Sequence, residues 1–172
     1  QGIFGIGGEA RGDLEIVSAS RDCELTIEDI KESHAGKIIV GGSFIGIDAY
    51  KKALELKVRG IVVGGFNYYD LEEVLGYRLG VAITGTEDLD TSLVVTEGYG
   101  NIKMSERTFN LLKSHDGKFV SINGATQIRA GVIRPEIVIP LKKGEISDVN
   151  DSKNQNLGME IDSLVRVIRA PF

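Results

Sequence analysis

The sequence has few of the residues that stabilise secreted domains or bind metals. Its one cysteine, Cys23, cannot form an internal disulfide, which favours a reducing compartment such as the cytoplasm. Histidine occurs only as His34 and His115, too few with one cysteine for a zinc site of ordinary spacing. No apolar run approaches the roughly 20 residues of a membrane helix. We therefore predict a cytoplasmic location, with no metal, no cofactor and no membrane partner.

Strong positive charge is also missing. The net charge of −5 excludes nucleic-acid binding over the whole surface, because phosphate binding needs concentrated lysine and arginine. The 172 residues, of which 42% are hydrophobic and 26% charged, suffice for one globular domain with a sizeable core.

The chain begins without methionine and ends at Phe172 within an apolar, strand-like run. These features predict a segment of a longer protein. We expect an α/β domain over residues 1–144, with a glycine-rich turn in Gly2–Gly12. A polar linker over 145–157 and the start of a β-segment over 158–172 would follow.

Short β-branched runs alternate with helical patterns through the middle of the sequence. Residues 36–42 and 60–65 are near-copies that predict buried parallel strands, each followed by a glycine pair. The apolar spacing over 47–58 predicts a helix between them, on which Asp48 with Lys52 and Glu55 with Arg59 have the i,i+4 spacing of ion pairs. The remaining expected strands are 14–19, 81–84, 93–96, 119–122, 137–141 and 164–168, and the remaining helices are 27–33, 70–75 and 105–114. This alternation predicts an α/β fold: a mainly parallel sheet with short covering helices and a few peripheral strands.

Each glycine pair follows a strand, at the edge where open α/β sheets bind ligands. Gly41–Gly42 and Gly64–Gly65 would let a phosphate or carboxylate approach the backbone closely. The alternative is that the pairs only make tight turns between strand and helix. Neither pair belongs to a known nucleotide-binding motif.

Hydroxyls and acids follow the next two expected strands. Thr84, Thr86, Glu87 and Asp88 come after one strand, while Thr96 and Glu97 end the other. In a parallel sheet they would share the edge of the glycine pairs, where carboxylates could bind a metal or act as acid and base. Helix-start acids and solvated loop charges explain them equally well.

Charge is unevenly distributed along the chain. Residues 70–97 hold seven acids against one arginine, whereas 123–143 hold four cations against one acid. The two segments could pack together within the domain. Alternatively, a loop of polar side chains binds an anionic ligand or partner; its members are Asn123, Thr126, Gln127, Arg129 and Arg134.

Residues 158–172, with the basic, β-branched run Leu164-Val-Arg-Val-Ile-Arg169, resemble the first strand of a KOW-type β-barrel. Together with residues 1–9 and 122–136, they make the chain resemble a family of uncharacterised prokaryotic proteins. The resemblance implies a central α/β domain between a lipoyl-like β-domain and a KOW-like segment. It brings no catalytic residues.

The strand-Gly-Gly-helix pattern is also similar to the swivelling β/β/α domains of phosphotransfer and dehydratase enzymes, which serve as mobile carriers. The phosphohistidine of the phosphotransfer members has no counterpart, because His34 and His115 both lie outside the expected strand-end loops.

Two functions remain open from the sequence. The first is a non-catalytic binding or docking domain of a larger cytoplasmic protein, whose partners are an anionic molecule or protein and other domains of the same polypeptide. The second is an enzyme fragment that uses Glu87, Asp88 and Glu97. A nucleic-acid partner would bind only through the KOW-like segment, with Arg166 and Arg169.

Overall fold

The computed structural model of the chain describes residues 1–76, 89–127 and 133–141. The chain divides into two compact units, Gln1–Ile139 and Pro140–Phe172, and the first contains all the described helices and strands. The strands expected at 81–84 and 164–168 fall outside the described residues. No helix in the described ranges is both long enough and apolar enough to cross a membrane.

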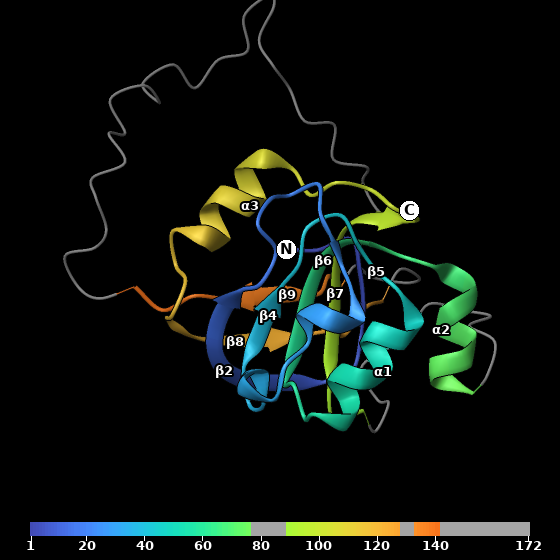
Figure 1. Cartoon of the computed structure of the whole chain (residues 1–172). Helices are drawn as coiled ribbons and strands as arrows, with labels where there is room; N and C mark the ends of the chain where they lie inside the picture. Colours follow the sequence, from blue (N-terminus) through green and yellow to red (C-terminus); the bar gives the residue numbers. More distant parts are fainter. Residues whose placement is uncertain (77–88, 128–132, 142–172) are drawn as a thin grey trace, which may run out of the picture. The chain divides into compact units, whose positions relative to one another are not determined.

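The described secondary structure is rich in strands (Figure 1). The strands are β1 (Phe4–Ile6), β2 (Glu9–Ile16), β3 (Glu24–Leu25), β4 (Ile38–Val40), β5 (Phe44–Ile45), β6 (Gly60–Phe66), β7 (Ser92–Tyr99), β8 (Phe119–Asn123) and β9 (Glu136–Val138). The helices are α1 (Ile47–Glu55), α2 (Tyr68–Leu75) and α3 (Glu106–Lys113), with 3-10 turns at Ile27–Asp29 and Glu32–His34. Gly76 ends α2 in the left-handed conformation, and Ser105 caps α3, both at positions expected from the sequence.

The strands form one mixed sheet in the order β1-β7-β6-β4-β2-β8-β9, with β5 and β3 attached beside β6. The central strands β7, β6, β4 and β2 are parallel. Strand β1 at one side, and β8 with β9 at the other, pair antiparallel. The sheet is strongly curled into a half-barrel. The prediction of a mainly parallel, helix-covered sheet is therefore wrong.

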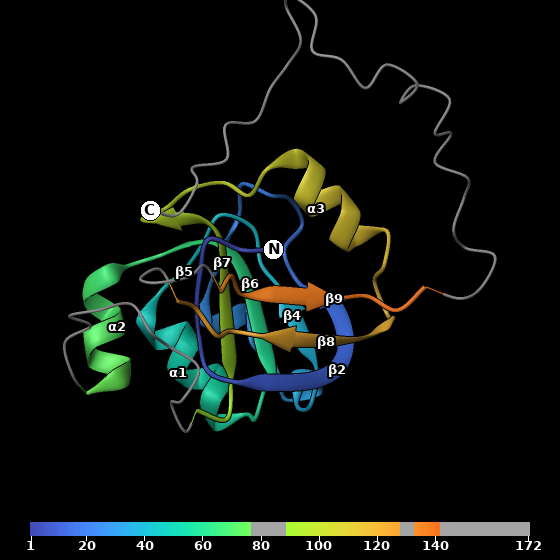
Figure 2. The same ribbon diagram turned by 180° about the vertical axis from the view of Figure 1, so that it is seen from behind.

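The sheet curls at β2, which pairs with two neighbouring strands that run in opposite directions. Leu14–Ile16 pair in parallel with β4, whereas Glu9–Asp13 pair antiparallel with β8. At Gly12, close to the junction of these halves, an added methyl group would lie 2.4 Å from the carbonyl oxygen of Gly36. Glycine therefore permits the close approach at which the chain bends, and β8 and β9 cross in front of the parallel strands in the view of Figure 2. Sequence patterning gave no sign of this double pairing.

The glycine-rich start is not a turn, as was predicted, but two strands joined at Gly7, which has φ +80°. Gly5 lies inside β1, where a methyl group would be 2.7 Å from the Leu93 carbonyl oxygen and 2.6 Å from that of Gly124. Neighbouring backbone thus passes so close on both sides that only glycine fits. The glycines reflect this packing rather than a reversal of the chain.

Two apolar layers cover the two faces of the parallel strands. Ile39, Ile61 and Leu93 face the layer that contains α1 and α2 residues such as Tyr50 and Leu71. The strand residues between them face the opposite layer, with Met104 and the α3 side chains; these strand residues are Ile38, Val40, Val62 and Val94. Because both faces are buried, the strands read as continuous apolar runs.

Candidate functional site

The glycine pairs at the carboxyl ends of β4 and β6 are buried against the chain's own backbone. A methyl group at Gly42 would lie 2.4 Å from the Cys23 carbonyl oxygen, and one at Gly64 would lie 2.0 Å from that of Ile102. At Gly65 the Gly100 carbonyl oxygen would be 1.8 Å away, and at Gly41 the nearest atom is a Val63 methyl at 2.9 Å. Close packing of the chain accounts for glycine here, and ligand binding by the pairs stays a prediction.

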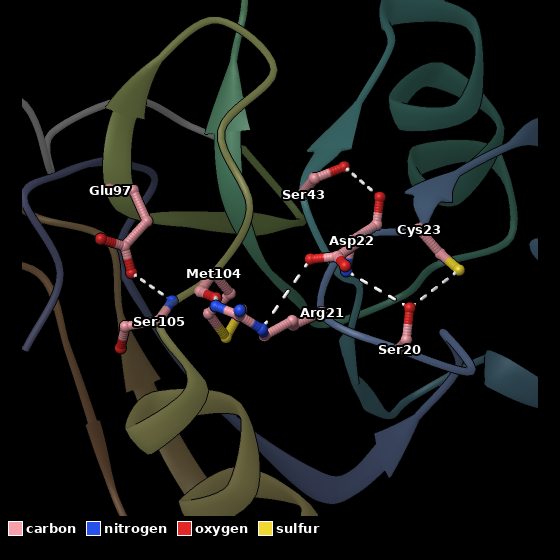
Figure 3. A network of polar contacts seen from close by, with 8 residues as sticks. All are labelled: Ser20, Arg21, Asp22, Cys23, Ser43, Glu97, Met104 and Ser105. Carbon is pink, nitrogen blue, oxygen red and sulfur yellow. Dashed lines mark hydrogen bonds and ion pairs between the residues drawn. The ribbon is translucent and has the colours of Figure 1, made fainter.

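The segments that cover these glycines are joined by the polar network of Figure 3, which extends from the loop after β2 to the segment before α3. Arg21 donates to the Met104 carbonyl oxygen at 3.3 Å, and its Nε lies 3.8 Å from Asp22 Oδ1. Ser43 Oγ donates to the Asp22 carbonyl oxygen at 3.0 Å. Arg21 thus ties the two covering segments together.

The exposed thiol of Cys23 belongs to the same network, since its Sγ lies 3.3 Å from Ser20 Oγ (Figure 3). Nearby in sequence, the Ser18 hydroxyl is buried and has no hydrogen-bond partner among the residues that the structure describes. Sequence analysis had not singled out this serine-rich loop.

Glu97 has a structural partner on the same network. Its Oε1 accepts the backbone N–H of Ser105 at 2.8 Å and the hydroxyl of Thr96 at 3.3 Å. Ser105 is the N-cap of α3, so the carboxylate favours the helix start through hydrogen bonding and charge. The predicted Thr96 and Glu97 are therefore together, but half-buried and engaged with α3.

A row of aromatic rings lies beside this end of the sheet. Tyr99 packs 5.4 Å from Phe4 and 5.3 Å from Tyr68, whose ring is 5.9 Å from that of Tyr69. Burial, and secondarily Tyr68, raises the pKa of Tyr99 to about 12, so its phenol stays protonated at neutral pH. The carboxyl ends of the strands are thus bordered by packed rings as well as by covering loops.

The polar loop predicted to bind an anion is bonded within the domain. Asn123 pairs with Glu136 of β9 as well as with Glu9 of β2, and its Oδ1 accepts the Ala125 N–H at 2.9 Å. Arg134, two residues before Glu136, donates to the Ile3 carbonyl oxygen at 3.1 Å. Asn123 and Arg134 therefore lie on neighbouring segments, and each bonds to a backbone group of the chain.

Two other residues of that loop pack within the domain. The Thr126 hydroxyl is buried and bonds both backbone groups of Gly5, and Gln127 bridges Ile133. The remaining predicted site residues lie outside the described ranges; these are Thr84, Thr86, Glu87, Asp88 and Arg129. Within the described ranges, no group of three or more His, Cys, Asp or Glu side chains is placed to hold a metal ion.

Two hollows open at the opposite, amino end of the parallel strands. The first, of about 240 Å³, has Lys57, Arg59 and Asp90 among its lining residues. The second, of about 460 Å³, is lined by Glu9, Ala10, Arg11 and Arg59. Arg59 therefore lines both hollows, which we call the Lys57 hollow and the Arg11 hollow.

The backbone around Arg59 is held firmly in place. Arg59 N–H donates to the Lys37 carbonyl oxygen at 2.9 Å, and Ser92 N–H donates to the Arg59 carbonyl oxygen at 3.1 Å. The buried Thr91 hydroxyl donates to the Val58 carbonyl oxygen at 2.6 Å. The walls of the Lys57 hollow are thus linked by hydrogen bonds between the starts of β6 and β7.

The side chains of Lys57 and Arg59 are exposed, and neither forms a hydrogen bond or an ion pair with any residue that the structure describes. The expected Glu55–Arg59 pair is absent because α1 ends at Glu55. Lys57 then takes φ +58°, a left-handed conformation usual for glycine, and redirects the chain into β6. The i,i+4 spacing that would have paired Arg59 is broken at this turn.

Among the residues that the structure describes, the side-chain partner of Arg11 is an exposed one, Glu9. Arg11 Nη2 lies 2.9 Å from Glu9 Oε1, with 67% and 57% of the two side chains accessible. Such a surface pair contributes about 0 to 1 kcal/mol and exchanges easily for a stronger anion. The Arg11 hollow therefore offers a second cation beside Arg59.

This cluster could not be found from the sequence because Arg11 is far from Lys57 and Arg59 in the chain and all three resemble ordinary surface charges. One local feature could have indicated it. Lys57 stands just after a helix, where glycine is the usual residue. Comparison of the chain with protein families, with curated proteins and with solved structures finds no match.

Proposed function

We propose that the chain is a non-catalytic binding domain that holds a small anionic ligand in the hollows around Arg59. The observation that carries this proposal is that Arg59 lines two hollows while its guanidinium group has no partner among the described residues. Guanidinium presents paired N–H donors that match a phosphate or carboxylate. Lys57 adds a second positive charge in one hollow and Arg11 adds one in the other.

The carboxylates of Asp90 and Glu9 also line the hollows. They oppose a bare anion and favour ligands that hydrogen-bond as well, for example through a protonated oxygen. The site would therefore be selective for small, hydrogen-bonding anions such as hydrogen phosphate rather than for any negative charge.

We place this domain in a larger cytoplasmic protein, where the lone thiol of Cys23 would stay reduced. Its macromolecular partners would be other domains of the same polypeptide. Binding of the ligand between the starts of β6 and β7 would then influence those domains.

Calorimetric titration with inorganic phosphate at low ionic strength tests the proposal. We expect wild-type dissociation constants on the order of 1 mM and at least about ten-fold weaker binding for Arg59→Ala, the usual loss for a charged hydrogen bond. Arg107→Ala is the matched control, because it removes one exposed positive charge from α3. Equal binding by the wild type and Arg59→Ala, or an equal loss in both variants, would refute the proposed function.

A further inference from the structure

The two hollows share one side chain, and this arrangement bears on the size of the ligand. The Lys57 hollow, at about 240 Å³, is too small for most cofactor-sized molecules, which need roughly 300 to 1,000 Å³. The Arg11 hollow, at about 460 Å³, is wider. Because Arg59 lines both, a ligand that reaches from one to the other passes Arg59.

We propose that the natural ligand carries two linked phosphate groups, one in each hollow, with Arg59 between them. This inference rests on the proposed function and names its ligand class. Guanidinium has five N–H donors spread over two edges, so one arginine can bind two neighbouring anionic groups at once. A lysine could not replace it, because an ammonium ion acts as a single point charge.

Each hollow holds one further cation for its own phosphate. Lys57 serves the first and Arg11 the second, after exchanging its exposed Glu9 partner for the ligand. Each hollow also has one carboxylate, Asp90 or Glu9, which would accept a hydrogen bond from a protonated phosphate oxygen. The matching sets, one cation and one carboxylate on either side of Arg59, fit a ligand with two similar anionic ends.

The conformation of Lys57 supports a role for its side chain. A residue other than glycine at φ +58° carries a steric cost, and glycine would occupy this turn without it. Lys57→Gly therefore removes the ammonium group while relieving the backbone. It is a test variant that should remain folded.

The experiment titrates the full 172-residue chain with phosphate, diphosphate and succinate, using calorimetry at constant ionic strength. We expect diphosphate to bind with a stoichiometry of one per chain and about ten-fold or more tighter than phosphate, because the second group binds intramolecularly. Succinate, which carries two carboxylates, tests whether the site prefers any ligand with two charged groups or prefers phosphate groups. Tighter binding of succinate than of diphosphate would overturn the ligand class.

Variants on either side of Arg59 test the straddling geometry. Lys57→Gly and Arg11→Ala should each weaken diphosphate binding about ten-fold, yet change phosphate binding about two-fold or less, because one intact hollow remains. If diphosphate bound no tighter than phosphate, or bound two per chain, the two-group ligand would be refuted. The proposed function would survive that result as long as Arg59→Ala still weakened phosphate binding about ten-fold or more, so the two failures are distinguishable.

Discussion

The carboxyl and amino ends of the parallel strands β2, β4, β6 and β7 differ in what lies against them. At the carboxyl ends, the loop after β2 and the segment before α3 pack onto Gly42 and Gly64, and Arg21 joins them. At the amino ends, Lys57 and Arg59 line hollows and have no partner among the described residues. Among the described residues, the end where open α/β sheets usually bind ligands is filled, whereas hollows lie at the other end.

This difference shows what a glycine pair after a strand indicates. It indicates that another group passes close to the strand's backbone, and in this chain that group is the backbone of the chain's own loops. Carbonyl oxygens are the nearest atoms to Gly42, Gly64 and Gly65, so the local field there disfavours an anion. The cations at the amino ends favour one.

The largest expected effect on stability comes from adding a side chain at the covered carboxyl end of the strands. Gly64→Ala would force a methyl group to within 2.0 Å of the Ile102 carbonyl oxygen, so we expect a loss of about 3 kcal/mol in the free energy of unfolding. Urea denaturation measures it. Gly8→Ala, where nothing lies within 4 Å, is the control and should be nearly neutral. Equal stabilities of the two variants would show that the carboxyl end is open after all.

The next largest effect on stability tests whether Glu97 has a structural role rather than a reactive one. Glu97→Ala removes the acceptor of the Ser105 N–H and should destabilise the domain by about 1 to 2 kcal/mol. Glu97→Gln retains an oxygen acceptor and should lose less than half of that. Chemical denaturation of both variants decides the matter; a harmless Glu97→Ala would mean that this carboxylate does not hold α3.

At the amino end, one substitution should raise the free energy of unfolding rather than lower it. Lys57→Gly relieves the left-handed backbone and should stabilise the domain by about 1 kcal/mol. Lys57→Ala serves as the comparison, because it removes the same charge but keeps the steric cost. If both variants had the same melting temperature, the strain at this turn would be negligible.

The smallest effect concerns pH. Burial lowers the pKa of His34, although Glu15 opposes the shift, and its Nδ1 accepts the Lys31 N–H at 3.2 Å. The unfolded chain therefore takes up a proton first as the pH falls below about 6.5, so His34 makes the folded state less stable from that pH down to its lowered pKa. His34→Asn should flatten this loss in unfolding experiments between pH 7 and 5. An unchanged slope would assign the pH dependence to other groups.

Local features of the fold could be predicted from the sequence, whereas the pairing of distant segments could not. Ser105 as a helix cap and Gly76 as a helix end follow from chemistry within a few residues. The antiparallel sides of the sheet depend on contacts such as Ala10 with Ile122, which no local pattern encodes.

The candidate site shows the same division. Thr96 and Glu97 were expected side by side because they are adjacent in sequence. Arg59 and Arg11 are brought to the same hollow by the curl of the sheet, and Arg59 lacks its expected partner Glu55 because the chain turns at Lys57. Charges that are dispersed in sequence carry no sign of such a cluster.

The central claim is that anions bind at the amino ends of the parallel strands. Amide resonances of the isotope-labelled chain, followed by NMR during a phosphate titration, test it most directly. We predict that the largest shifts fall on Arg59, Asp90 and Arg11, and that they saturate together. Shifts centred on Gly42, Ser43 and Gly65, with Arg59 unmoved, would contradict the account.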